Sequence, residues 1–342
     1  MKPTVKKNVD LTSLNTLGVQ SIAPEFIEIK SADELTVLGQ SGYFQKSGPF
    51  ILGGGSNVLF KKNPDVPVLK ISIPGIQILE ETESEVIVKV GAGVNWHQFV
   101  KWSVENNYGG IENLALIPGT TGAAPIQNIG AYGVELSKTV EYVEFYHIGD
   151  QKIMRFNSDE CRFGYRDSIF KNKLKGKAVV TGLAVRLSKV NHEIVDHYYA
   201  LKEYLEKENI LSPEIQDIFE AVINIRKSKL PDPSLLGNAG SFFKNPIVKA
   251  DVASRIQKEF DEVPIYDMDG SRKKIPAGWL IEQAGWKGKK VGNVGTYKNQ
   301  ALVIVNHGGA TGKEIFEHAL RIQKSVKEKF GIELTPEVNI IG

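Results

Sequence analysis

The stretch PFILGGGSN, residues 49 to 57, places three glycines and a serine directly after a short apolar run. An apolar run that ends in glycines is typical of a strand that stops at a tight turn. Because glycine has no side chain, the backbone N–H groups of residues 53 to 57 could approach an anion closely, and a pyrophosphate would suit such a loop. A glycine-rich turn without a ligand is the alternative that this stretch leaves open.

Strand and helix patterns alternate on both sides of the loop. Strands are predicted at VPVLKISI (66–73), SEVIVKVGAG (84–93), VEYVEFYHI (140–148, followed by a turn at Gly149 and Asp150), AVVTGLAVRL (178–187) and QALVIVNH (300–307). Helices are predicted at 31–40, from Ser212 and Pro213 as N-cap and first helical position to the prolines of LPDP, and at 311–330 with Gly331 as the C-terminal cap. This mixture indicates an α+β fold.

Length and composition bound the class of protein. A chain of 342 residues exceeds what one hydrophobic core usually supports, so two or three domains are expected, with a boundary near 227–230. The formal net charge is only +2 and no long basic run occurs, so we expect no nucleic-acid partner. The N-terminus lacks the apolar run of a signal peptide and no stretch of about 18 apolar residues occurs, so we expect no membrane segment. The single cysteine, Cys161, excludes an intramolecular disulfide and fits a cytoplasmic location.

Several familiar catalytic and nucleotide motifs are missing. The six histidines form no H-E-x-x-H pattern and no cysteine accompanies them at ligand spacing, so no metal site is predicted. The chain has no G-x-G-x-x-G, and GGATGK (308–313) lacks the spacing and the hydroxyl residue of a P-loop. GNAGSFF lacks the G-x-S-x-G elbow of a serine hydrolase. Any dinucleotide must therefore be held by another fold.

The segment LIPGTTGAAPIQNIGAYGVEL, residues 116 to 136, is long, rich in small residues and uncharged until Glu135. Such a segment is a poor surface linker and a good lining for a flat, uncharged ring system. Its backbone, with Gln127, Asn128 and Tyr132, could read the edge of an isoalloxazine ring. A purely structural loop is the alternative.

Three further residues stand in unusual surroundings. In GNAGSFFKNP (237–246), Ser241 follows small residues and precedes Phe242 and Phe243, although a simple turn would explain the glycines equally well. Arg166 in CRFGYRDSIFK and Glu337 in LTPEVNIIG could likewise be an ordinary surface arginine and an exposed carboxylate. None of these signals is specific alone.

Taken in order, these motifs resemble one family, the UDP-N-acetylenolpyruvoylglucosamine reductases. The resemblance covers nearly the whole chain and is carried by NTLG (15–18), GGGSNVLF, ENLALIPGTTGAAPIQNIGAYGVE, CRFGYRDSIFK, KLPDPSLLGNAGSFFKNP, IPAGWLIEQAG and LTPEVNIIG. The tyrosine in DHYYAL indicates the class of this family that has an extra tyrosine-bearing loop.

The resemblance implies a fold and a domain order. It implies a two-domain FAD-binding fold of the vanillyl-alcohol-oxidase type, with subdomains at 1–72 and 73–226, followed by an α+β substrate-binding domain at 229–330. The C-terminal residues 331–342 would return to the first subdomain and bring Glu337 to the flavin. We expect a monomer, whose partner is a UDP-sugar.

The resemblance also implies the site residues. FAD would be bound noncovalently, with NADPH as hydride donor. The residues expected to bind FAD are Gly53, Gly54, Gly55, Ser56, Asn57, Pro118, Gly119, Thr120, Thr121, Gly122, Gln127, Asn128, Ile129, Gly130, Ala131, Tyr132 and Gly133. The residues expected to bind the UDP-sugar are Tyr198, Lys229, Asn245, Tyr266, Lys274 and Gln300. For the tyrosine, a shift of one residue would exchange Tyr198 for Tyr199.

In the implied reaction, NADPH reduces FAD and leaves before the enolpyruvyl substrate enters. Hydride addition to the terminal methylene then places negative charge beside the substrate carboxylate, and this charge must be spread and protonated. Ser241 would be the proton donor. Arg166 and Glu337 would polarise the carboxylate, and the Arg166 guanidinium would stabilise the enolate-like state. Lys229 or a bound water could stabilise the serine alkoxide, and the sequence does not distinguish them.

Two other functions remain compatible with parts of the sequence. An FAD-dependent oxidase with the same cofactor-binding domains would share GGGSN and the 116–136 segment, but it would not need KLPDP or GNAGSFFKNP. A nucleotide-sugar binding protein that has lost catalysis would not need Ser241, Arg166 and Glu337 together. The oxidase would consume oxygen, and the binding protein would not be bleached by NADPH.

Overall fold

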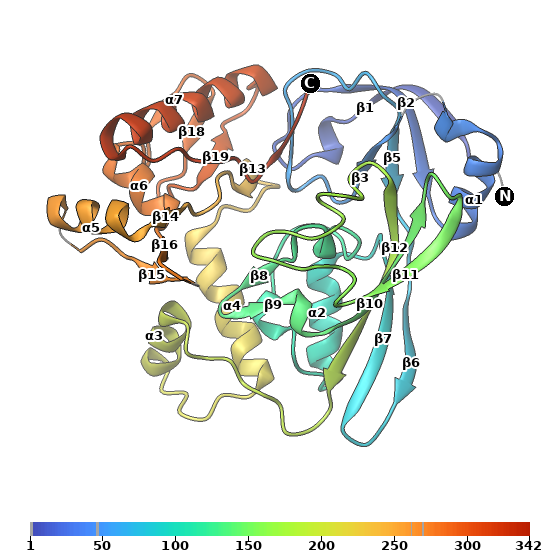
Figure 1. Cartoon of the computed structure of the whole chain (residues 1–342), viewed down its shortest axis with the longest axis horizontal. Helices are drawn as coiled ribbons and strands as arrows, with labels where there is room; N and C mark the ends of the chain where they lie inside the picture. The colour runs from blue at the N-terminus through green and yellow to red at the C-terminus, as the bar shows by residue number, and fades with distance from the viewer. Residues whose placement is uncertain (1–2, 46–47, 261, 269) are drawn as a thin grey trace. The chain divides into compact units, whose positions relative to one another are not determined.

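The computed structural model describes residues 3–45, 48–260, 262–268 and 270–342. The chain forms two compact units (Figure 1). Unit 1 consists of Met1–Val9, Ala23–Gly54 and Pro64–Lys227, and unit 2 consists of Asp10–Ile22, Gly55–Asn63 and Ser228–Gly342. The division into three domains at 72 and 226–229 stays a prediction.

Unit 1 is built on two sheets. The first has the order β1 (Val5–Asp10), β2 (Ile22–Ile29), β5 (Val68–Ile71) and β3 (Phe50–Leu52), and β2, β5 and β3 run parallel. The second is antiparallel, in the order β11 (Lys152–Asn157), β10 (Val140–His147), β12 (Ala178–Ser188), β7 (Glu85–Gly91) and β6 (Ile76–Glu81). Figure 1 shows β12, β7 and β6 as long neighbouring strands. A small ladder pairs β8 (Gly130–Ala131) with β9 (Val134–Glu135).

The helices of unit 1 are α1 (Ala32–Gln40), α2 (Trp96–Glu105), α3 (Tyr199–Lys207) and α4 (Ile215–Lys229), whose last two residues belong to unit 2. Helices α1 and α2 begin at side chains that accept a backbone N–H, namely Ser31 from Glu34 and Asn95 from Gln98. The apolar faces of the helices and of the second sheet share one core, in which Trp96 and Phe99 are among the fully buried side chains.

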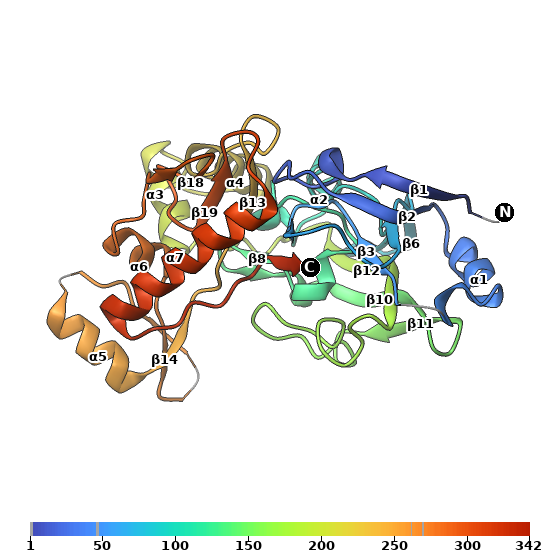
Figure 2. The ribbon, with the colours of Figure 1, turned by 90° about the horizontal axis from the view of Figure 1, so that it is seen from above.

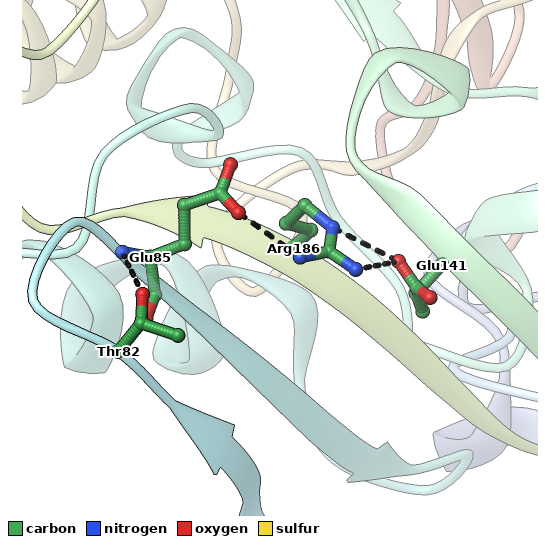
Figure 3. A network of polar contacts seen from close by, with 4 residues as sticks. All are labelled: Thr82, Glu85, Glu141 and Arg186. Atoms are coloured by element: carbon green, nitrogen blue, oxygen red, sulfur yellow. Dashed lines mark hydrogen bonds and ion pairs between the residues drawn. The ribbon is translucent and has the colours of Figure 1, made fainter.

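The solvent-facing side of the second sheet carries a charged network. Arg186 of β12 donates to Glu85 of β7 at 3.0 Å and to Glu141 of β10 at 2.9 Å (Figure 3). Thr82 accepts the Glu85 amide at 3.0 Å and closes the turn between β6 and β7. Because these side chains are exposed or half-buried, the network spans three strands but adds little to stability.

Unit 2 contains a four-stranded antiparallel sheet in the order β13 (Gly237–Ser241), β19 (Val303–Asn306), β18 (Val294–Thr296) and β17 (Lys290–Val291). A three-stranded sheet has the order β14 (Ile247–Lys249), β16 (Arg272–Lys274) and β15 (Tyr266–Asp267). Near the C-terminus, β20 (Asn339–Ile341) pairs in parallel with β4 (Val58–Phe60). The helices are α5 (Ala250–Glu259), α6 (Ala277–Gln283) and α7 (Gly312–Phe330), the long helix that Figure 2 shows in red.

Helix α7 follows the sequence expectation closely. It begins with a capping box between Thr311 and Glu314 and ends at Gly331, whose φ of 68° is left-handed. The apolar residues that recur along it at helical spacing are all buried, namely Ile315, Ala319, Ile322 and Val326. The strands predicted at 140–148 and 178–187 and the helix at 31–40 are also confirmed.

Two boundaries differ from the sequence prediction. Helix α4 begins at Ile215, so the start at Ser212 and Pro213 is wrong. The Asp217 carboxylate accepts the Glu214 amide at 2.8 Å, and the side chain that caps the helix therefore comes from inside it. The strand predicted at 300–307 begins only at Val303, because the Val303 amide closes a turn on the Gln300 carbonyl at 3.1 Å.

Candidate functional site

The glycine loop of unit 1 lies against the segment 118–122. A Cβ atom on Gly54 would lie 2.9 Å from the Gly119 Cα, and one on Gly53 would lie 2.9 Å from the Thr120 Oγ1. Both glycines are therefore needed for the two backbones to approach. Lys70 donates to the Gly53 carbonyl, and burial lowers the pKa of its ammonium group. The sequence analysis did not single out this lysine.

Hydrogen bonds hold the segment 118–122 against residues 91–96. The Trp96 amide donates to the Gly119 carbonyl at 3.0 Å, and the Thr121 hydroxyl donates to the Gly91 carbonyl at 2.6 Å. The Oγ1 of Thr120 is buried and has no hydrogen-bond partner among the residues that the structure describes. A buried hydroxyl at a cradle formed by glycines fits a polar ligand such as the pyrophosphate of FAD.

Most residues of the segment 116–136 are buried or half-buried, as its apolar composition predicts, and the segment is not a plain loop. It contains a 3-10 helix at Ala124–Gln127 and the ladder β8–β9. Asn128 is fully buried, and its amide nitrogen donates to Glu135 at 2.9 Å while its oxygen accepts the Ser137 amide at 2.9 Å. Because both the nitrogen and the oxygen of the Asn128 carboxamide are bonded to nearby residues of the chain, this side chain stabilises the conformation of the loop.

Arg166 lies at this same segment. Its guanidinium donates to the Gly130 carbonyl at 2.6 Å and to the Asn128 carbonyl at 3.4 Å. The residue adopts a left-handed φ of 53°, which a non-glycine residue keeps only where the surroundings hold it. The structure thus brings Arg166 to the backbone of the segment 116–136, which is predicted to contact the flavin and is called the flavin segment below.

Tyr132 links the flavin segment to two other parts of unit 1. Its ring meets the ring of Tyr198 edge to face, with centroids 5.4 Å apart, and its hydroxyl is hydrogen-bonded to Arg226 of α4. Burial raises the pKa of the Tyr132 phenol and lowers the pKa of the Arg226 guanidinium. The positive charge of Arg166 lowers the pKa of the Arg226 guanidinium further. A half-buried arginine that also feels the positive charge of a second arginine favours an anionic ligand.

In unit 2, Ser241 ends strand β13 and is exposed, whereas Phe242 and Phe243 are buried. The stretch is a bulged strand and not a simple turn, with a register shift between Asn238 and Ser241 and a left-handed φ of 67° at Gly240. Asn238 makes the bulge, since its side chain accepts the Gly240 amide and donates to the Leu236 carbonyl, both at 2.9 Å.

The C-terminal segment lies beside this strand. The Glu337 amide donates to the Phe242 carbonyl at 2.8 Å, and Phe243 forms a bridge with Pro336. Asn57, the last residue of GGGSN, donates to the Glu337 carbonyl at 3.4 Å. Unit 2 therefore brings together Ser241, Glu337 and the end of the glycine-rich stretch.

The residues predicted to bind the UDP-sugar are arranged in two groups. Tyr266 and Lys274 are paired across β15 and β16, with the lysine Nζ 5.5 Å from the tyrosine ring centroid. Near the start of α6, Asn245 accepts the Ala277 amide at 2.9 Å, and a Cβ on Gly278 would lie 3.0 Å from the Gln300 Oε1. Lys229 is exposed at the end of α4.

Sequence patterns gave no signal for three side chains that support this site. They are Arg226, which contacts Tyr132, Asn113, which binds two backbone carbonyls, and His97, which accepts the Leu116 amide at 3.1 Å. Each acts on residues far away in the sequence. Over the described ranges, no helix is both long and apolar enough to cross a membrane, and no cluster of three His, Cys, Asp or Glu side chains could hold a metal ion.

Comparison with known proteins gives two domain matches. Residues 42–157 match the family described as FAD binding domain. Residues 232–341 match the family described as UDP-N-acetylenolpyruvoylglucosamine reductase, C-terminal domain. The fold and the site therefore define a flavoprotein oxidoreductase in which an FAD-binding domain precedes a dedicated C-terminal domain.

Relatives match along almost the entire chain. The UDP-N-acetylenolpyruvoylglucosamine reductase of Flavobacterium johnsoniae is 46% identical over 98% of this chain and 99% of its own length. The one from Dechloromonas aromatica is 43% identical over 96% and 97%. A crystal structure of the Thermus caldophilus reductase, 23% identical, covers 100% of both chains with a TM-score of 0.69 and shows the same fold. The chain belongs to the UDP-N-acetylenolpyruvoylglucosamine reductase family.

Proposed function

We propose that this chain uses NADPH and bound FAD to reduce the enolpyruvyl group of UDP-N-acetylglucosamine enolpyruvate to the lactyl ether. The product, UDP-N-acetylmuramate, serves peptidoglycan synthesis and hence cell wall formation, cell shape and division. The observation that carries this proposal is the 46% identity to a reductase of that name over 98% of the chain. That match spans both the FAD-binding domain and the C-terminal domain.

The FAD supplies the hydride transfer when it is bound. The residues proposed to hold it are those of 53–57, 118–122 and 127–133, and the buried Thr120 hydroxyl and the glycine contacts support this assignment. Neither 53–57 nor 116–136 contains a histidine or a cysteine, so a noncovalent cofactor is proposed. Cys161 is buried and its thiol pKa is raised to about 12 by desolvation, which makes it a poor nucleophile.

Ser241 is proposed to give a proton to the substrate carbon. Its hydroxyl is exposed, and no atom lies within 4 Å of the position that a Cβ would take on the preceding Gly240, so a ligand can approach. Glu337 and Arg166 are proposed to polarise the substrate carboxylate. The position of Glu337 is supported by its bond to the residue after Ser241.

The UDP-sugar is proposed to be bound by Tyr198, Lys229, Asn245, Tyr266, Lys274 and Gln300. The exposed fractions and contacts of the two neighbouring tyrosines favour Tyr198 over Tyr199. Tyr198 is 46% exposed and packs on Tyr132, whereas Tyr199 is 78% exposed and begins α3. This arrangement also supports membership of the class with the tyrosine-bearing loop.

A cytoplasmic location and a monomeric state are further proposals. The single cysteine is free, as expected in a reducing compartment.

A visible spectrum recorded in three anaerobic steps tests the function. The purified protein should be yellow, should lose its colour with NADPH, and should regain it when UDP-N-acetylglucosamine enolpyruvate is added. An oxidase of the same superfamily would regain colour with oxygen and not with the enolpyruvyl substrate. A binding protein without catalysis would not be bleached at all. Either result would remove the proposed function.

A further inference from the structure

Asn113 is fully buried at the 3-10 helix Glu112–Leu114 and joins two segments that are far apart in the sequence. Its Nδ2 donates to the Tyr132 carbonyl at 3.0 Å and to the Val195 carbonyl at 2.7 Å. Val195 follows Asn113 by 82 residues. A carboxamide nitrogen carries two hydrogens, so one side chain can satisfy both acceptors at once.

The two segments that Asn113 joins also touch each other. A Cβ on Gly133 would lie 3.0 Å from Val195 Cγ1 and 3.3 Å from His197 Nε2. The left-handed φ of 87° at Gly133 and of 47° at Tyr132 turns the backbone toward this contact. Immediately beyond it, the Tyr198 ring packs edge to face on Tyr132. Tyr198 is also the N-cap of α3, so its position depends both on that helix and on how residues 194–197 are held.

We infer that Asn113 is a positioning residue that holds residues 194–198, and with them Tyr198, against Tyr132. Among the residues that the structure describes, 194–197 lie between β12 and α3 and belong to no strand or helix, whereas the Tyr198 carbonyl accepts the Leu201 and Lys202 amides at the start of α3. The carboxamide thus replaces the backbone hydrogen bonds that would otherwise fix such a segment. Any effect on UDP-sugar binding rests on the proposed function, because it depends on Tyr198 contacting that ligand.

The other end of the same segment offers a matched control. Asn107 donates its Nδ2 to the Lys189 carbonyl at 3.1 Å, and this bond is exposed. An Asn→Asp change at either position removes a carboxamide donor and leaves a side chain of the same shape. Only the change at Asn113 removes the bond near Tyr198.

The test compares Asn113→Asp and Asn113→Ser with Asn107→Asp in the flavin-loaded, full-length protein. Asn113→Ser is neutral and keeps a single donor, so it decides the question if the buried carboxylate of Asn113→Asp prevents folding. The first measurement is the rate at which chymotrypsin cleaves after Tyr198 or Tyr199, with the sites located by mass spectrometry. This rate follows the population in which the segment is released. The second measurement is the KM for UDP-N-acetylglucosamine enolpyruvate together with the rate of flavin reduction by NADPH.

We expect cleavage to accelerate about tenfold in the folded Asn113 variants, the change expected for a net loss of roughly one or two hydrogen bonds. The Asn107 variant should stay within about twofold of the unchanged protein. The KM should rise by a similar factor while flavin reduction by NADPH keeps its rate. Unchanged cleavage in folded Asn113 variants would overturn the inference. Faster cleavage with an unchanged KM would support the role of Asn113 and instead remove Tyr198 from UDP-sugar binding.

Discussion

The backbone amide of Glu337 donates to the carbonyl of Phe242, the residue directly after Ser241, at 2.8 Å. Nearly a hundred positions separate the two residues in the chain. A second bond, from the Lys244 amide to the Thr335 carbonyl at 2.9 Å, helps to hold the two backbones side by side. The same segment continues into β20, which pairs with β4 just after the glycine-rich stretch. The C-terminal segment is thus an integral part of unit 2.

Replacing Glu337 with glutamine should lower turnover by about a hundredfold or more, because a neutral amide polarises a substrate group less than a carboxylate does. The flavin content should stay near normal, since the backbone bonds of Glu337 do not need its carboxylate. Glu333→Gln is the matched control, because its carboxylate is exposed and is bonded to Lys327 at 3.3 Å. Steady-state turnover of the two variants decides the matter. Activity of Glu337→Gln within about threefold of the unchanged protein would exclude a catalytic role.

Ser241→Ala should separate the two half-reactions. Flavin reduction by NADPH should keep its rate, because the serine is needed only after the hydride has been transferred. Reoxidation by the enolpyruvyl substrate should slow by about a hundredfold to ten-thousandfold, the usual effect of losing a general acid. Ser241→Cys should retain more activity than Ser241→Ala, and Ser234→Ala, at a hydroxyl bonded to Asp232, should behave like the unchanged protein. Stopped-flow absorbance would contradict the assignment if both half-reactions slowed equally.

Denaturation should release the flavin. Heat or acid precipitation is expected to leave a yellow supernatant and a colourless pellet, because no histidine or cysteine lies within 53–57 or 116–136 to form a covalent bond. Absorbance of both fractions is the measurement. Flavin that remains with the pellet after complete denaturation would refute noncovalent binding.

His97 should make flavin retention dependent on pH. Its Nδ1 accepts the amide of Leu116, which has a left-handed φ of 55°, and its ring stacks on Phe219. Burial and the charges of Lys101, Lys227 and Arg226 lower the pKa of the imidazole below its ordinary value of 6.5. The neutral ring thus stabilises the folded loop above pH 6.5, and this contribution is lost as the pH falls through the lowered pKa.

Flavin release measured by fluorescence between pH 7 and pH 5 tests this effect. His97→Asn keeps an acceptor without a titrating group, so the release curves of the two proteins should diverge as the pH falls. His147→Asn is the matched control, because His147 also accepts a backbone amide, from Asp150 at 3.1 Å, but lies outside the flavin segment. Superimposable curves for the unchanged protein and His97→Asn would contradict the prediction.

His318 should make unit 2 sensitive to acid. It is buried in α7 and bonded through Nε2 to the Thr296 hydroxyl at 3.0 Å, and within the described part of the chain its Nδ1 has no hydrogen-bond partner. Desolvation lowers its pKa to about 4 from 6.5. Because the unfolded chain binds the proton first, the free energy of unfolding should fall as the pH drops from 6.5 to 4, by a total on the order of 3 kcal/mol.

Denaturant titrations of the unchanged protein and of His318→Gln across this range give the measurement. The free energy of unfolding of the unchanged protein should fall relative to that of His318→Gln as the pH drops, because the glutamine variant lacks the titrating group. A difference that stays constant from pH 7 to pH 4 would show that His318 does not titrate as described.

Elements whose signals are local could be predicted from the residues alone. The helix at 312–330 was predictable because its apolar spacing, its capping box and Gly331 all lie within the helix or next to it. The motifs also indicated the family and its cofactor, which the full-length relatives support. Boundaries failed where two local signals competed. Ser212 and Pro213 are typical of a helix start, but the Asp217 carboxylate accepts the Glu214 amide and α4 begins at Ile215.

The hydrogen bonds between residues that are distant in the sequence could be seen only in the folded structure. Asn113 reaches Val195 across 82 positions, and Asn57 reaches Glu337 across 280. Arg226 is likewise one polar residue among several on α4 until the fold places it against Tyr132. A local pattern carries the period and the caps of a helix or strand. It carries no trace of which buried acceptor a given side chain will satisfy, because that pairing exists only once the packed chain has excluded water from both partners.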